Sequence, residues 1–228
     1  MNQDNFLQLT GEAIPLKGIK KIAARRMVEA WQAPAFHLSI DVEMQYALAR
    51  AKAGVGTTVT DVILLATRDA LLEVPQMNAH YKEEVITVYK EINIGVAVAT
   101  EAGLMVPVVH NAHLRDIQSI AESRQQIVAK ARTGKLGMSD IDGATFTISN
   151  LGMLGIDRFD AIINPPQIGI LAIGSTKKVP VVKDSGIAIA MQATFTITCD
   201  HRAVDGATGA KFLSAIKREI EDSAEISK

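Results

Sequence analysis

Residues 187–206, IAIAMQATFTITCDHRAVDG, contain the pattern that decides the fold. The run at 187–199 is rich in apolar and β-branched residues and predicts a long strand. His201 follows the end of this strand, and Asp205 lies at a position from which it can cap a helix that runs to about Glu221. A polar turn between a long strand and a helix is a place that suits a catalytic side chain.

Working outward from this stretch, apolar periodicity and capping residues predict the other elements. Apolar residues on one side (Ile19, Ile22, Ala23, Met27, Ala30 and Trp31) predict a helix at 19–31, and strict alternation predicts a half-buried strand at 36–44. A second helix is expected from a cap at Thr60 or Asp61 to Val74, and a third from Asp116 to about Arg132. Further strands are predicted at 92–99, 105–110, 144–149 and 168–173, the first two joined as a hairpin.

This order of elements predicts the fold class. Helices interspersed among strands and hairpin-like connections are typical of an α/β two-layer sandwich with a mixed sheet. With 228 residues, 48% of them hydrophobic, the chain can bury one sizeable core, and we divide it into a linker remnant at 1–13 and one domain at 14–228. Asn164-Pro165-Pro166, which lies among glycines, predicts a rigid turn. The sequence contains no strand–GxGxxG–helix unit, so we do not expect a dinucleotide-binding site.

Composition excludes several kinds of partner. Lys+Arg 24 against Asp+Glu 25 gives a formal net charge of −1, so we expect neither nucleic acid nor an anionic membrane surface as a partner. Apolar stretches are interrupted within about ten residues, which is short of the roughly 20 that cross a bilayer. Cys199 is the only cysteine, so no intrachain disulfide and no thiolate zinc site is expected. The N-terminal residues do not read as a signal peptide, and a reducing compartment is the natural expectation.

Two stretches carry groups that can do chemistry. The imidazole of His201 can take a proton from a thiol near neutral pH and return it. On spacing alone, an ordinary loop histidine beside a helix-capping Asp205 is the simpler interpretation. In FTISNLG at 146–152, a strand runs into a glycine turn, where the hydroxyl of Ser149 can donate to an oxyanion. No GxSxG elbow marks Ser149 as a nucleophile, and a turn-forming Ser149-Asn150 pair also explains this stretch.

Together these motifs resemble the acyltransferase component of 2-oxo acid dehydrogenase complexes. The resemblance rests on HRAVDG at 201–206, FTISNLGMLG at 146–155, GLMVPVV at 103–109 and INPPQ at 163–167, with 14–44 similar to the family's first helix and strand. The blocks occur in family order and cover roughly residues 14 to 220. The resemblance implies a chloramphenicol-acetyltransferase-like fold, a homotrimer that can pair into larger cages, and active sites between neighbouring subunits.

The same resemblance implies roles for individual residues. His201 would be the base on the attacking thiol, and Ser149 of another chain would stabilise the tetrahedral oxyanion without forming a covalent acyl-enzyme. Asp205 would order the His201 loop, with Arg25, Arg26 or Arg202 as its partner. Coenzyme A would bind as a substrate to Arg50, Thr58, Asn150 and Ser175. No metal is expected. Ala99 stands where some relatives have an acidic residue, so any contact made by that residue is lost.

The predicted function is therefore transfer of an acyl group between dihydrolipoamide and coenzyme A in a complex core, in the bacterial cytoplasm or the mitochondrial matrix. SNLGM at 149–153 is most similar to the pyruvate and acetoin types and favours acetyl, because succinyl-type relatives tend to carry threonine in place of Ser149. The lipoyl group would arrive on a separate domain, and the dehydrogenase components would be further partners. Two alternatives remain. One is a non-catalytic structural core component, against which His201 and Ser149 argue. The other is a free-standing acyltransferase for a small hydroxyl substrate, against which the INPPQ block and the first helix argue.

Overall fold

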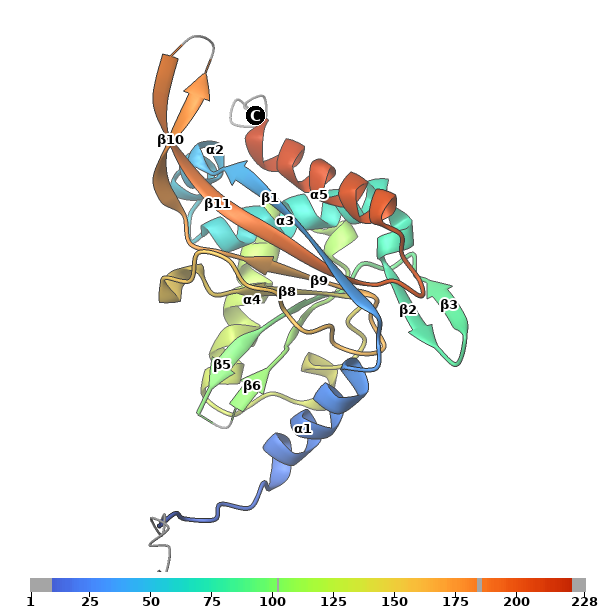
Figure 1. Cartoon of the computed structure of the whole chain (residues 1–228). Coiled ribbons are helices and arrows are strands. Elements are labelled where there is room, and N and C mark those ends of the chain that lie inside the picture. Colours follow the sequence, from blue (N-terminus) through green and yellow to red (C-terminus); the bar gives the residue numbers. More distant parts are fainter. Residues whose placement is uncertain (1–9, 102, 184–185, 223–228) are drawn as a thin grey trace, which may run out of the picture.

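The computed structural model describes residues 10–101, 103–183 and 186–222, and a seven-stranded mixed sheet lies at its centre (Figure 1). The strand order is β1-β11-β9-β8-β4-β7, and β10 also pairs with β11. Their bounds are Ala35–Glu43 (β1), Ile94–Val96 (β4), Val108–Val109 (β7), Phe146–Asn150 (β8), Gly169–Ile173 (β9), Lys177–Lys183 (β10) and Gly186–Asp200 (β11). β8 pairs in parallel with β4 and β9, and the other neighbours are antiparallel. Two hairpins lie outside the sheet: β2 (Ala79–Lys82) with β3 (Val85–Val88), and β5 (Val98–Thr100) with β6 (Gly103–Met105).

A helical layer packs against this sheet. Its helices are α2 (Gln45–Ala53), α3 (Val59–Glu73), α4 (Ile117–Arg132) and α5 (Gly206–Glu221). The rings of Phe146 on β8 and Phe212 on α5 meet edge to face with centroids 5.3 Å apart, and both side chains are fully buried. On the other face, the segment that contains Ala161 and Ile163 packs over Ile170 and Ala172 of β9. The α/β sandwich with a mixed sheet, as predicted from the order of elements, is confirmed.

The beginning of α3 differs from the prediction. Its N-cap is Thr58 rather than Thr60 or Asp61. Asp61 is the third residue of the helix, and its carboxylate accepts the backbone N–H of Thr58 at 2.8 Å. Asp61 is fully buried and is also paired with Arg124 of α4, whose Nη2 lies 3.0 Å from Oδ2. The buried ion pair therefore joins two helices and the cap at once.

Most predicted helices and strands have the expected bounds, but four elements were not predicted and two predicted strands are longer than those in the structure. The predicted strands at 92–99 and 105–110 each divide, so that β4 and β7 join the main sheet while β5 and β6 form their own hairpin. α2, β2, β3 and β10 were not predicted. β10 contains Pro180, which weakens a strand signal. α2 has no side-chain cap and only a weak apolar face, so nothing local marks where it begins.

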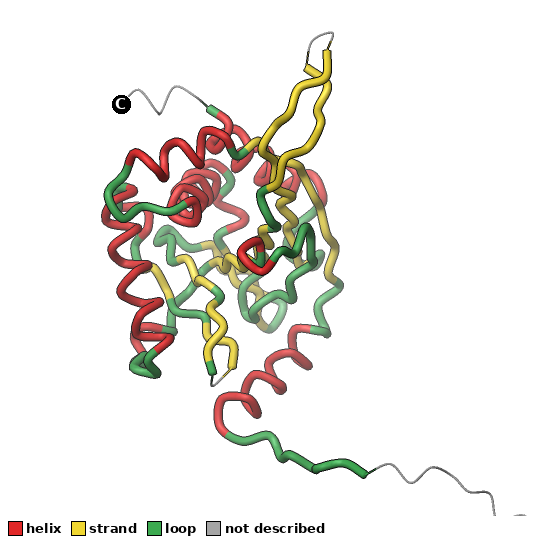
Figure 2. Tube along the Cα trace, turned by 90° about the vertical axis from the view of Figure 1, so that its left-hand side faces the viewer, coloured by secondary structure: helices red, strands yellow, loops and turns green. Residues whose placement is uncertain are grey.

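The helix α1 (Gly18–Ala30) confirms the predicted helix but not the burial of its apolar face. Ile22 is 57% exposed and Trp31 is 80% exposed, and Ala30 is the only buried residue of the helix. Figures 1 and 2 show α1 extending away from the rest of the chain. The outer ends of β10 and β11 likewise project, with Val182 and Ile187 exposed. Neither apolar surface is covered by the part of the chain that the structure describes. Most of the predicted linker remnant at 1–13 lies outside the described residues.

Candidate active site

The predicted catalytic histidine lies on a turn at the end of the longest strand. β11 ends at Asp200, and α5 begins at Gly206. The backbone N–H of His201 donates to the carbonyl of Pro34 at 3.0 Å, and its ring lies against Phe36 with centroids 4.6 Å apart. His201 is exposed. The turn therefore presents an imidazole to solvent while its backbone is tied to the segment that leads into β1.

Asp205 caps α5, and this was correctly predicted. Its carboxylate accepts the backbone N–H of Thr208 at 2.7 Å. The hydrogen bonds from Thr208 hold the pKa of Asp205 below its ordinary value, with smaller contributions from the nearby charges of Lys211 and His201. The carboxylate is thus used as a helix cap at the end of the turn.

Arg202 is not the partner of Asp205, so this part of the prediction is wrong. Its guanidinium instead binds Asp200, with Nη2 2.6 Å from Oδ2. Asp200 is 3% exposed, and the pair raises the pKa of Arg202 further. A buried carboxylate requires a compensating cation, and Arg202 is the nearest one along the chain. No role was predicted for Asp200; the available signal was an acidic residue at a buried strand end, two residues before an arginine.

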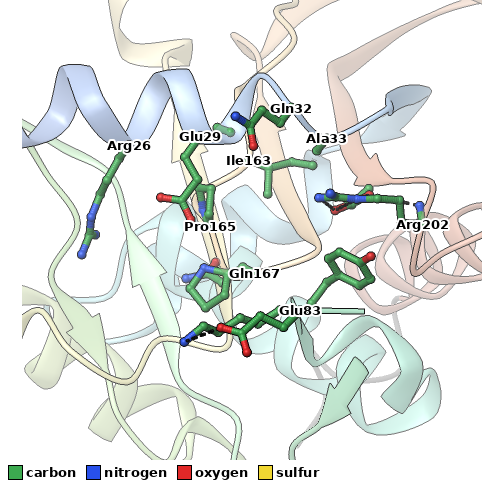
Figure 3. A pocket seen from close by; sticks show the side chains of 14 residues that line it. Arg26, Glu29, Gln32, Ala33, Glu83, Ile163, Pro165, Gln167 and Arg202 are labelled. Atoms are coloured by element: carbon green, nitrogen blue, oxygen red, sulfur yellow. Dashed lines mark hydrogen bonds and ion pairs between the residues drawn. The ribbon is translucent and has the colours of Figure 1, made fainter. Parts of the chain in front are cut away.

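A cavity of about 520 Å³ adjoins this pair (Figure 3). Helix α1 and the segment that follows it form one wall, and Asp200 and Arg202 form the side next to the His201 turn. The wall at α1 consists of Arg26, Glu29, Ala30, Gln32 and Ala33. The β2–β3 hairpin and the INPPQ block supply the rest, namely Tyr81, Lys82, Glu83, Ile163, Pro165, Pro166 and Gln167. Figure 3 shows Arg26 and Glu29 projecting from α1 toward this space. The candidate partner Arg26 is therefore directed to the cavity.

The INPPQ block is fixed to the sheet through Gln167. The hydroxyl of Thr147 on β8 donates to Gln167 Oε1 at 2.6 Å, and Gln167 Nε2 donates to the carbonyl of Ala144 at 3.2 Å. Both Thr147 and Gln167 are buried. The Pro165–Pro166 peptide is cis. The predicted turn thus stands beside the strand that carries Ser149.

Ser149 and His201 do not meet within one chain. In the sheet, Ser149 pairs with Ala172 of β9, which pairs with Thr196 of β11. His201 lies five residues beyond Thr196, which corresponds to about 15 Å along the strand direction at roughly 3.3 Å per residue, in addition to the two strand spacings across the sheet. A single chain therefore cannot bring the imidazole and this hydroxyl to one substrate.

Two of the four predicted coenzyme A residues lie close to Ser149. The side-chain oxygen of Asn150 accepts the backbone N–H of Gly152 at 2.9 Å, and the hydroxyl of Ser175 donates to Asp157 at 2.8 Å. Asn150 and Ser175 follow the parallel strands β8 and β9, so Ser149, Asn150 and Ser175 gather at the carboxyl ends of these strands. Hydrogen bonds from Lys177 and Ser175 lower the pKa of Asp157.

The other two predicted residues belong to the helical layer. Arg50 lies in the last turn of α2 and is half-buried. Thr58 caps α3, and its hydroxyl donates to Asp61 at 2.7 Å, so this hydroxyl already has a structural partner. Within the described ranges, no cluster of three His, Cys, Asp or Glu side chains is arranged to hold a metal, and no helix is long and apolar enough to span a membrane.

Comparison with known proteins assigns the chain to a family. The model of the 2-oxoacid dehydrogenases acyltransferase (catalytic domain) family matches residues 8–227. The chain belongs to this family. It is 41% identical over 220 residues to the dihydrolipoyllysine-residue acetyltransferase component of the pyruvate dehydrogenase complex of Rickettsia bellii, covering 92% of this chain and 53% of the relative. It is 38% identical to the mitochondrial counterpart from Schizosaccharomyces pombe, covering 94% of this chain and 47% of that protein. The chain thus spans about half the length of these curated relatives.

Solved structures of the family have the same fold. The dihydrolipoamide acetyltransferase of Azotobacter vinelandii superposes with a TM-score of 0.89 at 27% identity, covering 96% of this chain and 95% of that one. The cubic core of the pyruvate dehydrogenase multienzyme complex gives a TM-score of 0.90 at 27% identity, covering 100% of this chain and 98% of that one. A chloramphenicol acetyltransferase shares the fold, with a TM-score of 0.56 at 15% identity and coverage of 86% and 94%. The predicted fold family is therefore confirmed.

The Azotobacter structure also offers a comparison of spacing. It comes from an investigation of the roles of one serine, one histidine and one asparagine in the catalytic mechanism of that enzyme. Those three residues follow one another at the same intervals along the Azotobacter chain as Ser149, His201 and Asp205 do here. The third position differs, since this chain has an aspartate where the Azotobacter enzyme has an asparagine.

Proposed function

We propose that this chain transfers an acyl group, specifically acetyl, between dihydrolipoamide and coenzyme A. The observation that carries the proposal is the presence of Ser149, His201 and Asp205 at the intervals of the Azotobacter triplet, with the same serine and histidine and with aspartate in place of asparagine. The relatives named above are dihydrolipoyllysine-residue acetyltransferases, which supports acetyl as the group transferred. His201 is retained and exposed, which argues against a purely structural role for the chain.

The proposed mechanism uses direct attack of one thiol on the thioester of the other. His201 takes the proton of the attacking thiol, and the thiolate adds to the acyl carbonyl carbon. The resulting oxyanion is stabilised by the hydroxyl of Ser149, and removal of such a donor typically raises the barrier by about 2.7–4 kcal/mol. Collapse breaks the original carbon–sulfur bond, and the departing thiolate recovers the proton from the imidazolium. No metal and no acyl-enzyme takes part, and the reverse reaction uses the same groups.

The proposed site is shared between subunits of a homotrimer. Because Ser149 and His201 lie apart within one chain, the oxyanion donor comes from a neighbouring copy. Exposed apolar side chains on α1, such as Ile22 and Trp31, provide surface for contacts between copies. The similarity to a cubic core supports a multimeric assembly, within which we propose the trimer as the stable unit and any pairing of trimers as weak.

Coenzyme A is proposed to bind near the carboxyl ends of β8 and β9. Asn150 and Ser175 lie beside Ser149 there, so a thiol held by these residues is directed toward the oxyanion donor. Arg50 is the cation proposed for the phosphates, and Thr58 is the weakest of the four candidates because its hydroxyl already binds Asp61. The lipoyl group is proposed to reach the site on a separate domain, and the dehydrogenase components are the other proposed partners. We place the chain in the bacterial cytoplasm or the mitochondrial matrix; one relative comes from a bacterium and another is named mitochondrial.

Acyl transfer rates test this function directly. Purified chain is mixed with free dihydrolipoamide and with acetyl-, succinyl- or isobutyryl-coenzyme A in parallel, and formation of the acyl-dihydrolipoamide thioester is followed. We expect acetyl transfer to have the highest kcat/KM. Faster succinyl or isobutyryl transfer would replace the acyl assignment, and the absence of all three transfers in folded protein would refute the function.

A further inference from the structure

The turn that carries His201 is held by the residues on both sides of it. The carboxylate of Asp200 accepts three hydrogen bonds from Arg202: the backbone N–H at 3.0 Å, Nε at 2.9 Å and Nη2 at 2.6 Å. The carbonyl of Asp200 accepts the backbone N–H groups of Ala203 and Val204, both at 3.0 Å. These hydrogen bonds join Asp200, which precedes His201, to the three residues that follow it, so the backbone on both sides of His201 is held.

The other side of the Arg202 guanidinium rests on an aromatic ring. Its central carbon lies 4.3 Å from the ring centroid of Tyr81 on β2. The backbone N–H of Tyr81 donates to the carbonyl of Pro166 at 2.8 Å, which ties β2 to the INPPQ block. Figure 3 shows Arg202 extended along the cavity wall. The guanidinium is therefore held between a buried carboxylate and an aromatic face that belong to different parts of the chain.

We propose that Asp200, Arg202 and Tyr81 form a positioning clamp that fixes the orientation of His201 for proton transfer. The proposal rests on the proposed role of His201 as the base. The imidazole is exposed and packs against Phe36, so the backbone of the turn sets the position from which the ring extends and Phe36 supports one side of it. Misplacement of a reacting group by about 1 Å can cost about 10²-fold in rate, so a fixed backbone at this position affects catalysis.

The chemistry of the clamp requires an arginine. The planar guanidinium binds Asp200 through two nitrogens while its face contacts Tyr81, and lysine, a single ammonium, cannot do both. The pair Arg218–Glu73, which joins α5 to α3 on the exposed surface, offers a matched comparison away from the turn. If Arg202 acted only through stability, its folded variants would keep the kcat of the parent chain, as Arg218→Gln should.

The test compares five variants in the intact chain, with folding checked by circular dichroism: Arg202→Lys, Arg202→Gln, Tyr81→Leu, Asp200→Asn with Arg202→Gln, and Arg218→Gln as the control. Acetyl transfer from acetyl-coenzyme A to dihydrolipoamide is measured. For Arg202→Lys we expect kcat to fall by about 10-fold or more while both KM values stay within about 2-fold, since a positioning residue acts on the chemical step. The Asp200/Arg202 double variant should lose no more than Arg202→Gln alone, because the two side chains act as one unit.

Several results would overturn the clamp. Raised KM with unchanged kcat in Arg202→Lys would make Arg202 a substrate-binding residue. Kinetics equal to those of Arg218→Gln would remove it from the reaction. Arg202→Gln alone leaves Asp200 buried and unpaired and so can fail to fold. In that case the kcat values of the double variant and of Tyr81→Leu still show whether the clamp affects the chemical step. His201→Ala, measured in parallel, separates the role of His201 as the base from the role of the clamp. Full activity of His201→Ala refutes His201 as the base. If His201→Ala is inactive while the Arg202 variants have normal kcat, only the clamp is refuted.

Discussion

At the scale of single residues, the chemistry depends on an imidazole that must be both exposed and fixed. His201 meets both conditions, because its ring reaches solvent while its backbone N–H is bound to Pro34. His201→Ala should lower the acetyl transfer rate by about 10²–10⁴-fold, the usual contribution of a general base. The rate is measured with acetyl-coenzyme A and dihydrolipoamide in protein shown to be folded. Near-normal transfer would exclude His201 from the mechanism.

Ser149 is assigned as a donor to the oxyanion and not as a nucleophile. Ser149→Ala should lower kcat by about 10²-fold or more and leave the affinity for coenzyme A nearly unchanged, because the lost hydrogen bond forms only in the transition state. Steady-state kinetics and equilibrium binding of coenzyme A check the two halves of this expectation. An acetylated Ser149 trapped and detected by mass spectrometry would reverse the assignment.

The sequence predicted the candidate residues better than their contacts. His201, Ser149 and Asp205 stand out because each follows a strong strand signal or precedes a helix. The sequence left Arg25, Arg26 and Arg202 open as partners of Asp205 and did not indicate the pair of Arg202 with Asp200, since the burial of Asp200 is decided by the sheet around it. The separation of Ser149 from His201 likewise follows from strand order, which local periodicity does not specify.

At the scale of elements, the accuracy of each prediction followed the strength of its local signals. α4 and α5 begin at the predicted caps, because Asp116 and Asp205 accept backbone N–H groups three residues on. β11 is predicted by its β-branched residues. α2 and β10 lack such signals and owe their conformation to contacts with neighbours, as β10 does through its pairing with β11.

These two caps make stability depend on pH. Hydrogen bonds from Ser119 and Thr208 hold the pKa values of Asp116 and Asp205 below the ordinary value of 3.8. A carboxyl whose pKa is lowered by folding contributes stability that is present above pH 3.8 and is lost as the pH falls through the folded value. The free energy of unfolding should therefore decrease with acidification below about pH 4.

Asparagine isolates this effect, because it caps a helix about as well as aspartate but does not titrate. Urea unfolding of the double variant Asp116→Asn/Asp205→Asn should show a flatter dependence on pH between 5 and about 2.5 than the parent chain. Asp142→Asn, an exposed aspartate outside both caps, serves as the control. An unchanged pH dependence in the double variant would show that other carboxyls dominate acid unfolding.

At the scale of the whole molecule, the chain leaves apolar surface uncovered on α1 and on the β10–β11 hairpin. We expect a stable trimer, with larger cages weak or absent. Among residues 221–228, Ile226 is the only large apolar side chain available for a contact between trimers. It lies outside the described residues. The charged residues around it in the sequence, Glu221, Asp222 and Glu225, resist desolvation. Sedimentation across a dilution series measures both equilibria. A cage that persists at nanomolar concentration would mean that another surface links the trimers.

Sharing of the active site between copies can be separated from simple association. His201→Ala and Ser149→Ala chains, each inactive alone, are co-expressed with different tags in equal amounts, and mixed trimers are purified and verified by mass spectrometry. If the site combines His201 of one chain with Ser149 of its neighbour, about one in three interfaces of a mixed trimer carries both intact residues, because the two kinds of chain meet in the productive order once around the ring.

Mixed trimers should therefore recover about a third of the parent activity, although neither variant has a complete site of its own. The recovery follows from the strand register, which places Ser149 in the row of Ala172 and Thr196 while His201 lies beyond the end of β11. A site contained in one chain predicts no recovery, since each copy would still lack one of the two groups. Activity in mixed trimers no greater than in the separate variants, or a folded active monomer, would refute the shared site.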